Sequence, residues 1–431
     1  MSWRNALQLS LAFFCFMYAC HPFAGTPLPR LASSEHLAAG DAVHLSFFGE
    51  PSSDPLPHLS LPNGLSLSYG EILLLGDFYE VVGESLAQAK SDAVRRERFI
   101  KAFYSLAQAP QSVSEAKAIL AVAHAEYEAV EAGMEQGEKP EDVYRRIGAE
   151  DNRQWNCLTG GGCSRFWYLH PGRYLQLSKE DFDHFGQHAL LAYQTGHAAA
   201  LETATLAAKT KDNVTLSLAY AMNAFASHFL TDQFSSGHLR VPRQALFEQV
   251  SPSVIGSILV NYMHNEEDEF GLQVHNARGD HWKVYGDRYY FDASNRQTRV
   301  ILNEALQASV DEVSAAAMHP LLAQSAGVTD LLPEADSLED RQGEDIAPLF
   351  YWDAAQGKVL RRVDMSNEFD YHWTSEWWGW STLLKLAEQR GLPEDAQGAL
   401  ALSSSGQKAV NNGLIRNQSI VHFVDGGIKH S

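Results

Sequence analysis

The stretch Ala226-Ser-His-Phe-Leu-Thr-Asp-Gln-Phe-Ser-Ser-Gly-His-Leu239 places three side chains of the metal-binding type close together. His228 and Asp232 are four residues apart, so on a helix they lie on one face and can reach the same small divalent cation. Residues 213–234 carry apolar side chains at helical spacing, and His228 and Asp232 continue that register into the core. A buried, unpaired carboxylate is costly, so Asp232 needs a cation or a strong hydrogen-bond donor.

The residues that follow extend the pattern. Ser235, Ser236 and Gly237 end the predicted helix, and the resulting turn can bring His238 back beside the same place. His264 and Asp268 repeat the four-residue spacing on another predicted helix, residues 254–270. A lone buried histidine is usually an ordinary core residue, and a His–Asp pair is often a local hydrogen bond. From the spacing alone, a metal site and this simpler interpretation both stay open.

The order His-x3-Asp-x5-His, followed by His-x3-Asp, is similar to the zinc-dependent phospholipase C and P1-type nuclease superfamily. The residues that carry the resemblance are His228, Asp232, His238, His264 and Asp268. The second pair closes with Asp, as in the nuclease branch, where the phospholipase branch has Glu. Other stretches resemble a phospholipase C family of Gram-negative bacteria: Tyr69-Gly70-Glu71-Ile72, Gly76-Asp77-Phe78-Tyr79, Asp183-His184-Phe185-Gly186, Gly279-Asp280-His281-Trp282 and Tyr285-Gly286-Asp287. The resemblance covers roughly residues 60–290.

The resemblance implies two or three Zn²⁺ ions per chain. The first zinc would be held by Asp77, His184, His228 and Asp232, and the second by His238, His264 and Asp268. His170 is an alternative to His184, because its distance along the chain from His228 fits the family better. Asp232 would bridge to a third zinc. The superfamily completes that third site with the amino-terminal Trp of the mature chain and a nearby His, and no Trp lies near the expected cleavage points here.

The function implied is that of a secreted zinc metallophospholipase C. Such an enzyme hydrolyses the glycerol-side phosphodiester of phospholipids such as phosphatidylcholine through a zinc-bound hydroxide, giving diacylglycerol and a phosphorylated headgroup. Asp77 and Asp232 are the predicted catalytic carboxylates, and Asp77 could share the proton of the attacking water. Two alternatives stay open: a P1-type nuclease or 3′-nucleotidase, and a non-catalytic zinc-binding surface protein.

The size and charge of the chain limit the kinds of molecule that it can bind. The chain has 431 residues, 45% of them hydrophobic, which is ample for a large core. Its 33 basic and 53 acidic residues give a net charge of −20, which repels polyanions at long range and disfavours nucleic acid as a substrate. The same charge argues against binding anionic membranes by charge, so the predicted partner, a phospholipid membrane surface that the chain would meet as a monomer, is what the resemblance implies.

The first residues resemble a signal peptide over residues 1–24, with Arg4 before an apolar stretch from 7 to 19. Cleavage would fall near Ala24, or before Cys20 if the preceding residues act as a lipobox. The prediction is an exported protein, secreted or associated with the periplasm or outer membrane of a Gram-negative bacterium. The two cysteines beyond the leader, Cys157 and Cys163, then predict a disulfide.

The predicted fold is mostly α, with an all-helical phospholipase C/P1 nuclease-like core. Residues 25–325 form the expected catalytic domain, which starts with an irregular arm over 26–66. Ser68 with Glu71 predicts a capping box, and Ser178 with Asp181 predicts the start of a long Ala-rich helix that carries His184. The best strand signals lie between Gln273 and Phe291. Residues 326–431 form an aromatic-rich C-terminal extension, whose Trp and Tyr residues suit either lipid contact or, more simply, core packing.

Overall fold

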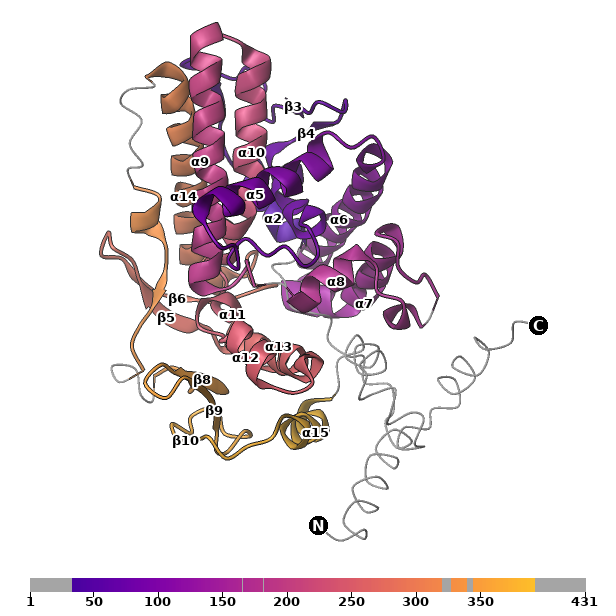
Figure 1. Cartoon of the computed structure of the whole chain (residues 1–431), viewed down its shortest axis with the longest axis vertical. Coiled ribbons are helices and arrows are strands. Elements are labelled where there is room, and N and C mark those ends of the chain that lie inside the picture. The colour runs from indigo at the N-terminus through magenta and orange to yellow at the C-terminus, as the bar shows by residue number, and fades with distance from the viewer. Residues whose placement is uncertain (1–32, 165, 181, 320–326, 339–343, 392–431) are drawn as a thin grey trace, which may run out of the picture.

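The computed structural model describes residues 33–164, 166–180, 182–319, 327–338 and 344–391, and these residues form a mostly helical protein (Figure 1). The predicted fold class is therefore confirmed at the level of a mostly α protein. The predicted signal peptide and the end of the extension lie outside the described residues. Within the described part, none of the helices combines the length and apolar character that a membrane span needs.

Three long helices form the centre of the fold: α9 (Gly186–Thr210), α10 (Asn213–Asp232) and α14 (Arg296–Met318) pack side by side (Figure 1). Asp212 caps α10 by accepting hydrogen bonds from the backbone N–H groups of Val214 and Thr215. From Ala219 onward α10 is buried on all sides, as expected of a helix surrounded by others. The helix predicted over residues 213–234 is confirmed, and its C-terminal turn carries His228 and Asp232 into the interior.

The N-terminal part packs against this bundle with helices of different lengths (Figure 1). They are α2 (Ser33–Asp41), α3 (Tyr69–Leu74), α4 (Gly76–Tyr79), α5 (Asp92–Ala107), α6 (Ser112–Glu135), α7 (Pro140–Leu158), η1 (Trp167–Leu169) and α8 (Arg173–Glu180). Two small hairpins pair β1 (Ser46–Phe47) with β2 (Glu50–Pro51) and β3 (Leu59–Ser60) with β4 (Ser66–Leu67). The capping box of Ser68 and Glu71 is present at the start of α3.

Two local predictions in this part are wrong. The stretch expected to be an irregular arm contains α2, a helix that is almost wholly buried against α3 and α6. The long Ala-rich helix begins at Gly186, and Ser178 lies inside the preceding helix α8. Gly186 has φ +51°, a left-handed conformation that glycine adopts at little cost, so the chain turns here before the helix starts. His184 consequently lies in a turn between two helices.

The chain after α10 builds the other side of the molecule. It continues through α11 (Ser236–Leu239), α12 (Arg243–Gln249), α13 (Ser253–Phe270), β5 (Leu272–His275), β6 (His281–Val284), η2 (Ala293–Asn295), η3 (Thr329–Leu331) and β7 (Glu334–Ala335). The antiparallel sheet has the order β6-β5-β7, and β5 and β6 lie within the region where strands were predicted.

The C-terminal extension forms a small unit against α12 and α13. Strands β8 (Phe350–Asp353), β9 (Lys358–Arg362) and β10 (Trp373–Thr374) make a sheet of order β10-β9-β8, and α15 (Gly379–Arg390) follows. A second hydrophobic core joins this unit to the two helices, and the fully buried Arg362 donates hydrogen bonds of 2.8 and 3.1 Å to Glu266 of α13. Phe350 is buried in this core, whereas Trp378 is 62% exposed. The aromatic residues therefore divide between packing and surface.

The predicted disulfide between Cys157 and Cys163 is present and closes a short loop after α7. Asn156, next to it, donates to the carbonyl oxygens of Gly162 and His170 and accepts from the Gly172 N–H. The segment that follows carries Arg173, whose Nε donates to the carbonyl of Phe78 at 2.6 Å. The loop thus supports helix α4, which carries Asp77.

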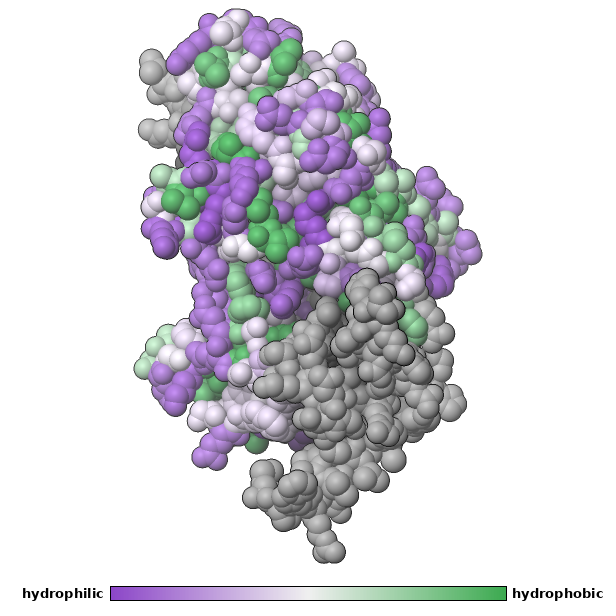
Figure 2. All heavy atoms as spheres, turned by 45° about the vertical axis from the view of Figure 1, so that its right-hand side comes forward, coloured by the Kyte–Doolittle hydropathy of each residue, from purple (hydrophilic) through white to green (hydrophobic). Residues whose placement is uncertain are grey.

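On the face drawn in Figure 2, hydrophobic residues occur in small groups among hydrophilic ones.

Candidate metal centre

The seven side chains predicted as metal ligands are all buried, and the structure brings six of them into two adjoining groups, while Asp268 lies behind the second group. They reach the interior from α4, α10, α11, α13 and the turn before α9. The structure adds two residues that the sequence analysis did not select, His36 on α2 and Asp287 after β6. We call the set His36, Asp77, His184, His228 and Asp232 the first group, and the set His238, His264 and Asp287 the second group.

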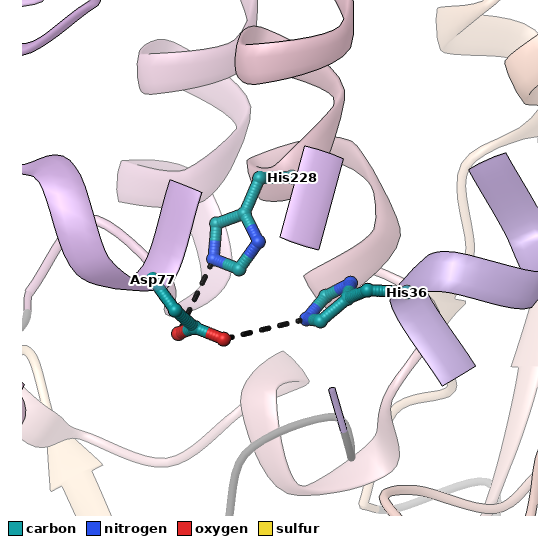
Figure 3. A group of neighbouring side chains, drawn as sticks. All are labelled: His36, Asp77 and His228. Atoms are coloured by element: carbon teal, nitrogen blue, oxygen red, sulfur yellow. Dashed lines mark ion pairs between the residues drawn. The ribbon is translucent and has the colours of Figure 1, made fainter. Parts of the chain in front are cut away.

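The first group is organised around His228. Its Nε2 lies 3.5 Å from Asp77 Oδ1, 3.6 Å from Asp232 Oδ2 and 3.0 Å from His184 Nδ1. Figure 3 shows His36, Asp77 and His228 converging from three different helices. The ligand atoms of these three residues lie within 4.8 Å of one another, and the same holds for His184, His228 and Asp232. The first group therefore offers two overlapping cation positions that share His228.

The protonation of His36 follows from its neighbour Thr231. The Thr231 hydroxyl donates to the carbonyl oxygen of His228, at 2.7 Å, so it accepts from Nδ1–H of His36, at 2.8 Å. A neutral His36 then turns the lone pair of Nε2 toward two carboxylates, with Asp232 Oδ1 at 3.7 Å and Asp77 Oδ2 at 4.0 Å. A lone pair facing carboxylate oxygens is unfavourable unless a cation or a proton lies between them.

His184 connects the two groups. Its Nε2 lies 2.6 Å from Oε1 of Glu80, while its Nδ1 lies 2.7 Å from Oδ2 of Asp232. With Nε2–H donated to Glu80, Nδ1 keeps its lone pair for the first group, which is the arrangement of a carboxylate–histidine–metal triad. The backbone carbonyl of the same residue accepts a hydrogen bond of 2.7 Å from Nδ1 of His238. Glu80 is thus a positioning residue that the sequence did not reveal.

The second group contains three buried atoms that face one another. Oδ2 of Asp287 lies 3.4 Å from Nε2 of His264 and 3.9 Å from Nε2 of His238. Among the residues that the structure describes, none of these three atoms has a hydrogen-bond partner. Nδ1–H of His238 is donated to the carbonyl of His184, so Nε2 of His238 carries the lone pair. Buried polar atoms are almost always satisfied, so these three neighbouring atoms form a place that could hold a cation.

Burial shifts the pKa values of the three side chains in the second group. It lowers the pKa of His238 well below the usual range and the pKa of His264 to about 4, so both imidazoles are neutral at neutral pH. Burial, together with the charge of Asp268, raises the pKa of Asp287 well above its usual value. Without a metal, Asp287 therefore keeps its proton to higher pH than an ordinary carboxyl group does. A cation can replace that proton and bind two neutral imidazoles at the same time.

Asp268, which the resemblance assigned as a ligand, lies behind His264. Its Oδ1 accepts from the Gly237 N–H at 2.7 Å and from the Ser235 hydroxyl at 3.2 Å. Its Oδ2 is 2.7 Å from Nδ1 of His264, although the two atoms are not aligned as in a hydrogen bond. Burial raises the pKa of Asp268 to about 7. In this structure Asp287, and not Asp268, faces the two imidazole Nε2 atoms.

Two glycines make room for the centre. A Cβ at Gly76 would lie 2.5 Å from the His228 ring, so only glycine lets α4 approach α10 at this point. A Cβ at Gly286 would lie 1.5 Å from Oδ1 of Asp268, which explains the glycine beside Asp287. Both glycines belong to motifs noted in the sequence, Gly76-Asp77 and Gly286-Asp287.

Glu35 ties the N-terminal helix to the loop that delivers Asp287. Its carboxylate accepts hydrogen bonds from the backbone N–H of Arg288 at 3.0 Å and of Tyr290 at 2.9 Å. Arg288 has φ +75°, a conformation that is strained for a residue with a side chain. The neighbouring residue His36 enters the first group, so helix α2 supports both groups.

Six of the seven ligands predicted from the sequence therefore lie in the two groups. The alternative histidine, His170, is exposed near the disulfide loop and belongs to neither group. Asp287 had a usable signal, because it lies in the quoted motif Tyr285-Gly286-Asp287. His36 had no comparable signal, since its helix was expected to be irregular.

Comparison with known proteins gives no match: no protein-family model, curated protein or solved structure matches the chain at a significant level. A function for this chain must therefore be inferred from the geometry of the two groups and from its sequence motifs.

Proposed function

We propose that this chain is a zinc-dependent phosphodiester hydrolase of the phospholipase C type. The observation that carries the proposal is the second group, in which His238, His264 and Asp287 aim three unsatisfied buried atoms at one point. The first group supports the proposal with two further, overlapping cation positions. The two groups adjoin, because the backbone carbonyl of His184 accepts a hydrogen bond from His238. Clustered cations of this kind suit the hydrolysis of phosphate esters.

The donor atoms fit zinc. Both groups consist of imidazole nitrogens and carboxylate oxygens, the ligand types that zinc accepts in catalytic sites. Asp77, His184, His228 and Asp232 would hold one ion, and a second position at His36 would overlap it through Asp77 and His228. His238, His264 and Asp287 would hold another. Three protein ligands leave a fourth position of a tetrahedral ion for water or substrate.

The zinc ions, when bound, would acidify water and offset the charge on the phosphate. The remaining work falls to the chain's own residues. Asp77, buried between His36 and His228, is placed to accept a proton from water at the first group. Glu80 holds the ring of His184 by its Nε2, and Thr231 holds that of His36 by its Nδ1. These bonds keep the donor atoms in place before a substrate arrives.

Phospholipid is the proposed substrate class. The net charge of −20 disfavours long polyanions such as DNA or RNA, whereas a zwitterionic headgroup meets no such repulsion. Exposed Trp352 and Trp378 on the C-terminal unit are residues that suit a lipid–water interface. The second candidate is a P1-type nuclease, which is favoured by one feature: both carboxylates near the second group are aspartates.

The central test is His228→Ala, with zinc content and phosphatidylcholine turnover measured on the same samples. Loss of the shared ligand should remove zinc from the first group and lower turnover by more than about a hundredfold, beyond the usual cost of altering a residue behind a ligand. His58→Ala is the matched control, because His58 is exposed and lies outside both groups. It should keep the zinc content and turnover of the wild type.

Three results would contradict the proposal in different ways. Wild-type zinc content in a folded His228→Ala protein would remove the metal assignment. Cleavage of single-stranded DNA without cleavage of phosphatidylcholine would replace the phospholipase by the nuclease. Tightly bound zinc with no turnover of either substrate would indicate a non-catalytic zinc-binding protein.

A further inference from the structure

A separate set of histidine and carboxylate side chains lies on the small sheet β6-β5-β7, outside both central groups. His281 on β6 is directly opposite His275 on β5, and His275 is directly opposite Glu334 on β7. The three residues therefore form one row across three strands. Side chains opposite one another on an antiparallel sheet have Cβ atoms roughly 5 Å apart, so such neighbours can share a ligand.

All three side chains lie on the outer face of the sheet. In β5 and β6 the alternate residues Val274 and Trp282 are buried, whereas His275 is partly exposed and His281 is exposed. Glu334 is exposed as well. The row is therefore accessible to an ion from solvent, in contrast to the buried central groups.

One histidine of the row is already oriented for a metal. Nδ1 of His275 lies 2.7 Å from Oδ1 of Asp336, a carboxylate that accepts its proton, and Nε2 then faces Oε2 of Glu334 at 3.9 Å. This is the arrangement in which a carboxylate behind a histidine fixes the nitrogen that binds the ion. Two ligand atoms on one tetrahedral zinc are about 3.4 Å apart. A small rotation of the exposed Glu334 side chain closes the difference.

The second imidazole lies beside the first, although the ligand atoms of the row are farther apart than those of the central groups. The rings of His275 and His281 have centroids 5.8 Å apart with their planes at 27°. Two imidazoles that share one tetrahedral zinc hold their centroids roughly 5 Å apart. We propose that His275, His281 and Glu334 form a peripheral site for a divalent transition-metal ion such as Zn²⁺, with Asp336 behind His275. This inference does not depend on the proposed catalytic function.

The ion would act as a cross-link. Strand β7 is only two residues long and pairs with β5 at two positions. Strand β5 directly follows α13, the helix that carries His264. An ion bound by residues of all three strands would fasten the segment around β7, which precedes the C-terminal unit, to the part of the fold next to the central site.

The test uses the full-length protein and Zn²⁺ alone. After equilibrium dialysis against an excess of Zn²⁺, elemental analysis should count one ion per chain fewer in His281→Ala than in the wild type. Glu334→Gln should retain the ion with weaker affinity. His372→Ala is the matched control: His372 is an exposed histidine 2.6 Å from Asp370, but it has no opposing histidine in the described sheet β10-β9-β8. It should bind as many ions as the wild type.

Hydrogen exchange provides a second readout that does not depend on the total count. Zn²⁺ should slow amide exchange at residues 334–336 in the wild type and in His372→Ala, and leave it unchanged in His281→Ala. Equal zinc counts in the wild type and His281→Ala, with no zinc-dependent protection of β7, would overturn the proposal. Because His281 is exposed, His281→Ala should fold, and an unchanged far-UV circular dichroism spectrum would check this.

Discussion

The first and second groups contain the same kinds of side chain, but they differ in the hydrogen bonds that their buried polar atoms make. In the first group, Glu80 and Thr231 fix the rings of His184 and His36 by hydrogen bonds that do not need an ion. In the second group, the facing atoms of His238, His264 and Asp287 lack hydrogen-bond partners among the described residues. Side-chain hydrogen bonds thus fix two of the three imidazoles of the first group, whereas the three facing atoms of the second group need a cation or a proton between them.

The difference also concerns charge. The first group has two aspartates and the nearby Glu80 around three imidazoles, while the second has Asp287 alone facing two imidazoles that burial keeps neutral. We therefore expect the first group to hold more positive charge, in line with its two overlapping positions. The second should hold one ion, whose removal must be matched by protonation.

The largest effect is expected for Asp232→Asn. Asp232 contacts His184, His228 and His36, so the loss of its charge weakens both positions of the first group. Zinc bound to the first group should be lost and phosphodiester turnover should fall by more than about a hundredfold, while one ion stays in the second group. Elemental analysis and turnover measure this. Loss of every ion would show that the two groups do not bind independently.

A paired substitution then identifies the carboxylate of the second group. Asp287→Asn should remove one ion per chain, because Asp287 faces both imidazole Nε2 atoms. Asp268→Asn should keep that ion, with affinity lowered about 10- to 100-fold through the changed support of His264. Zinc titrations of the two variants provide the comparison. The opposite ranking would restore Asp268 as the ligand, as the sequence predicted.

Glu80→Gln tests the support of the first group. Glutamine can still accept from Nε2–H of His184 but without a charge, so zinc affinity at the first group should fall about 10-fold or somewhat more. The second group should keep its affinity. Glu80→Asp, which keeps the charge on a shorter side chain, should recover part of the loss. Equal losses in both groups would mean that Glu80 acts on the fold as a whole.

Removal of the metal should expose a pH dependence of stability in the second group. Asp268 has its pKa raised from 3.8 to about 7 in the folded protein, so its contribution is full below pH about 4 and is lost as the pH rises to about 7. In chelated protein, Asp268→Asn should therefore gain stability over the wild type across this window, by roughly 1.4 kcal/mol per pH unit at most. Denaturant unfolding at several pH values measures the gain. A gain that shrinks with rising pH would contradict the assignment.

The smallest effect is expected for the disulfide. Replacing Cys157 and Cys163 by Ser opens a loop with a sequence separation of 6 residues, which should lower the free energy of unfolding by about 2 kcal/mol. The loop supports Arg173 and through it α4, so zinc affinity of the first group should fall slightly. Affinity of the second group should not change. Thermal unfolding and zinc titration of the double variant check both statements.

Much of the fold and centre could be predicted because helical spacing carries the information. His228 with Asp232 and His264 with Asp268 lie on helices whose apolar stripes are visible in the sequence, and all four are buried. Asp287 was not selected because it follows a strand and a turn, where spacing along the chain says little about position in space. Its carboxylate comes to His264 through the tertiary path of β5 and β6.

The remaining misses have similar physical causes. His36 belongs to a short helix with little amphipathic pattern, because nearly every residue of α2 is buried and polar residues such as Glu35 point inward too. Ser178 with Asp181 has the composition of a helix cap, yet the tertiary fold places the start of the helix at Gly186. At such points the local sequence fits more than one structure, and long-range contacts determine where a helix starts and which side chains are buried.

The carboxylate of Glu35 also constrains the order in which the protein can assemble. Its bonds to Arg288 and Tyr290 join residues 253 and 255 positions apart, among the most distant in sequence that the fold brings together. Contacts between residues so far apart in sequence slow folding, because the entropy of closing the long loop must be lost before the contact forms. We therefore expect the loop at Arg288 to form after most of the helices have packed. The second group would then be completed late, and we expect it to bind its ion as one of the last steps of folding.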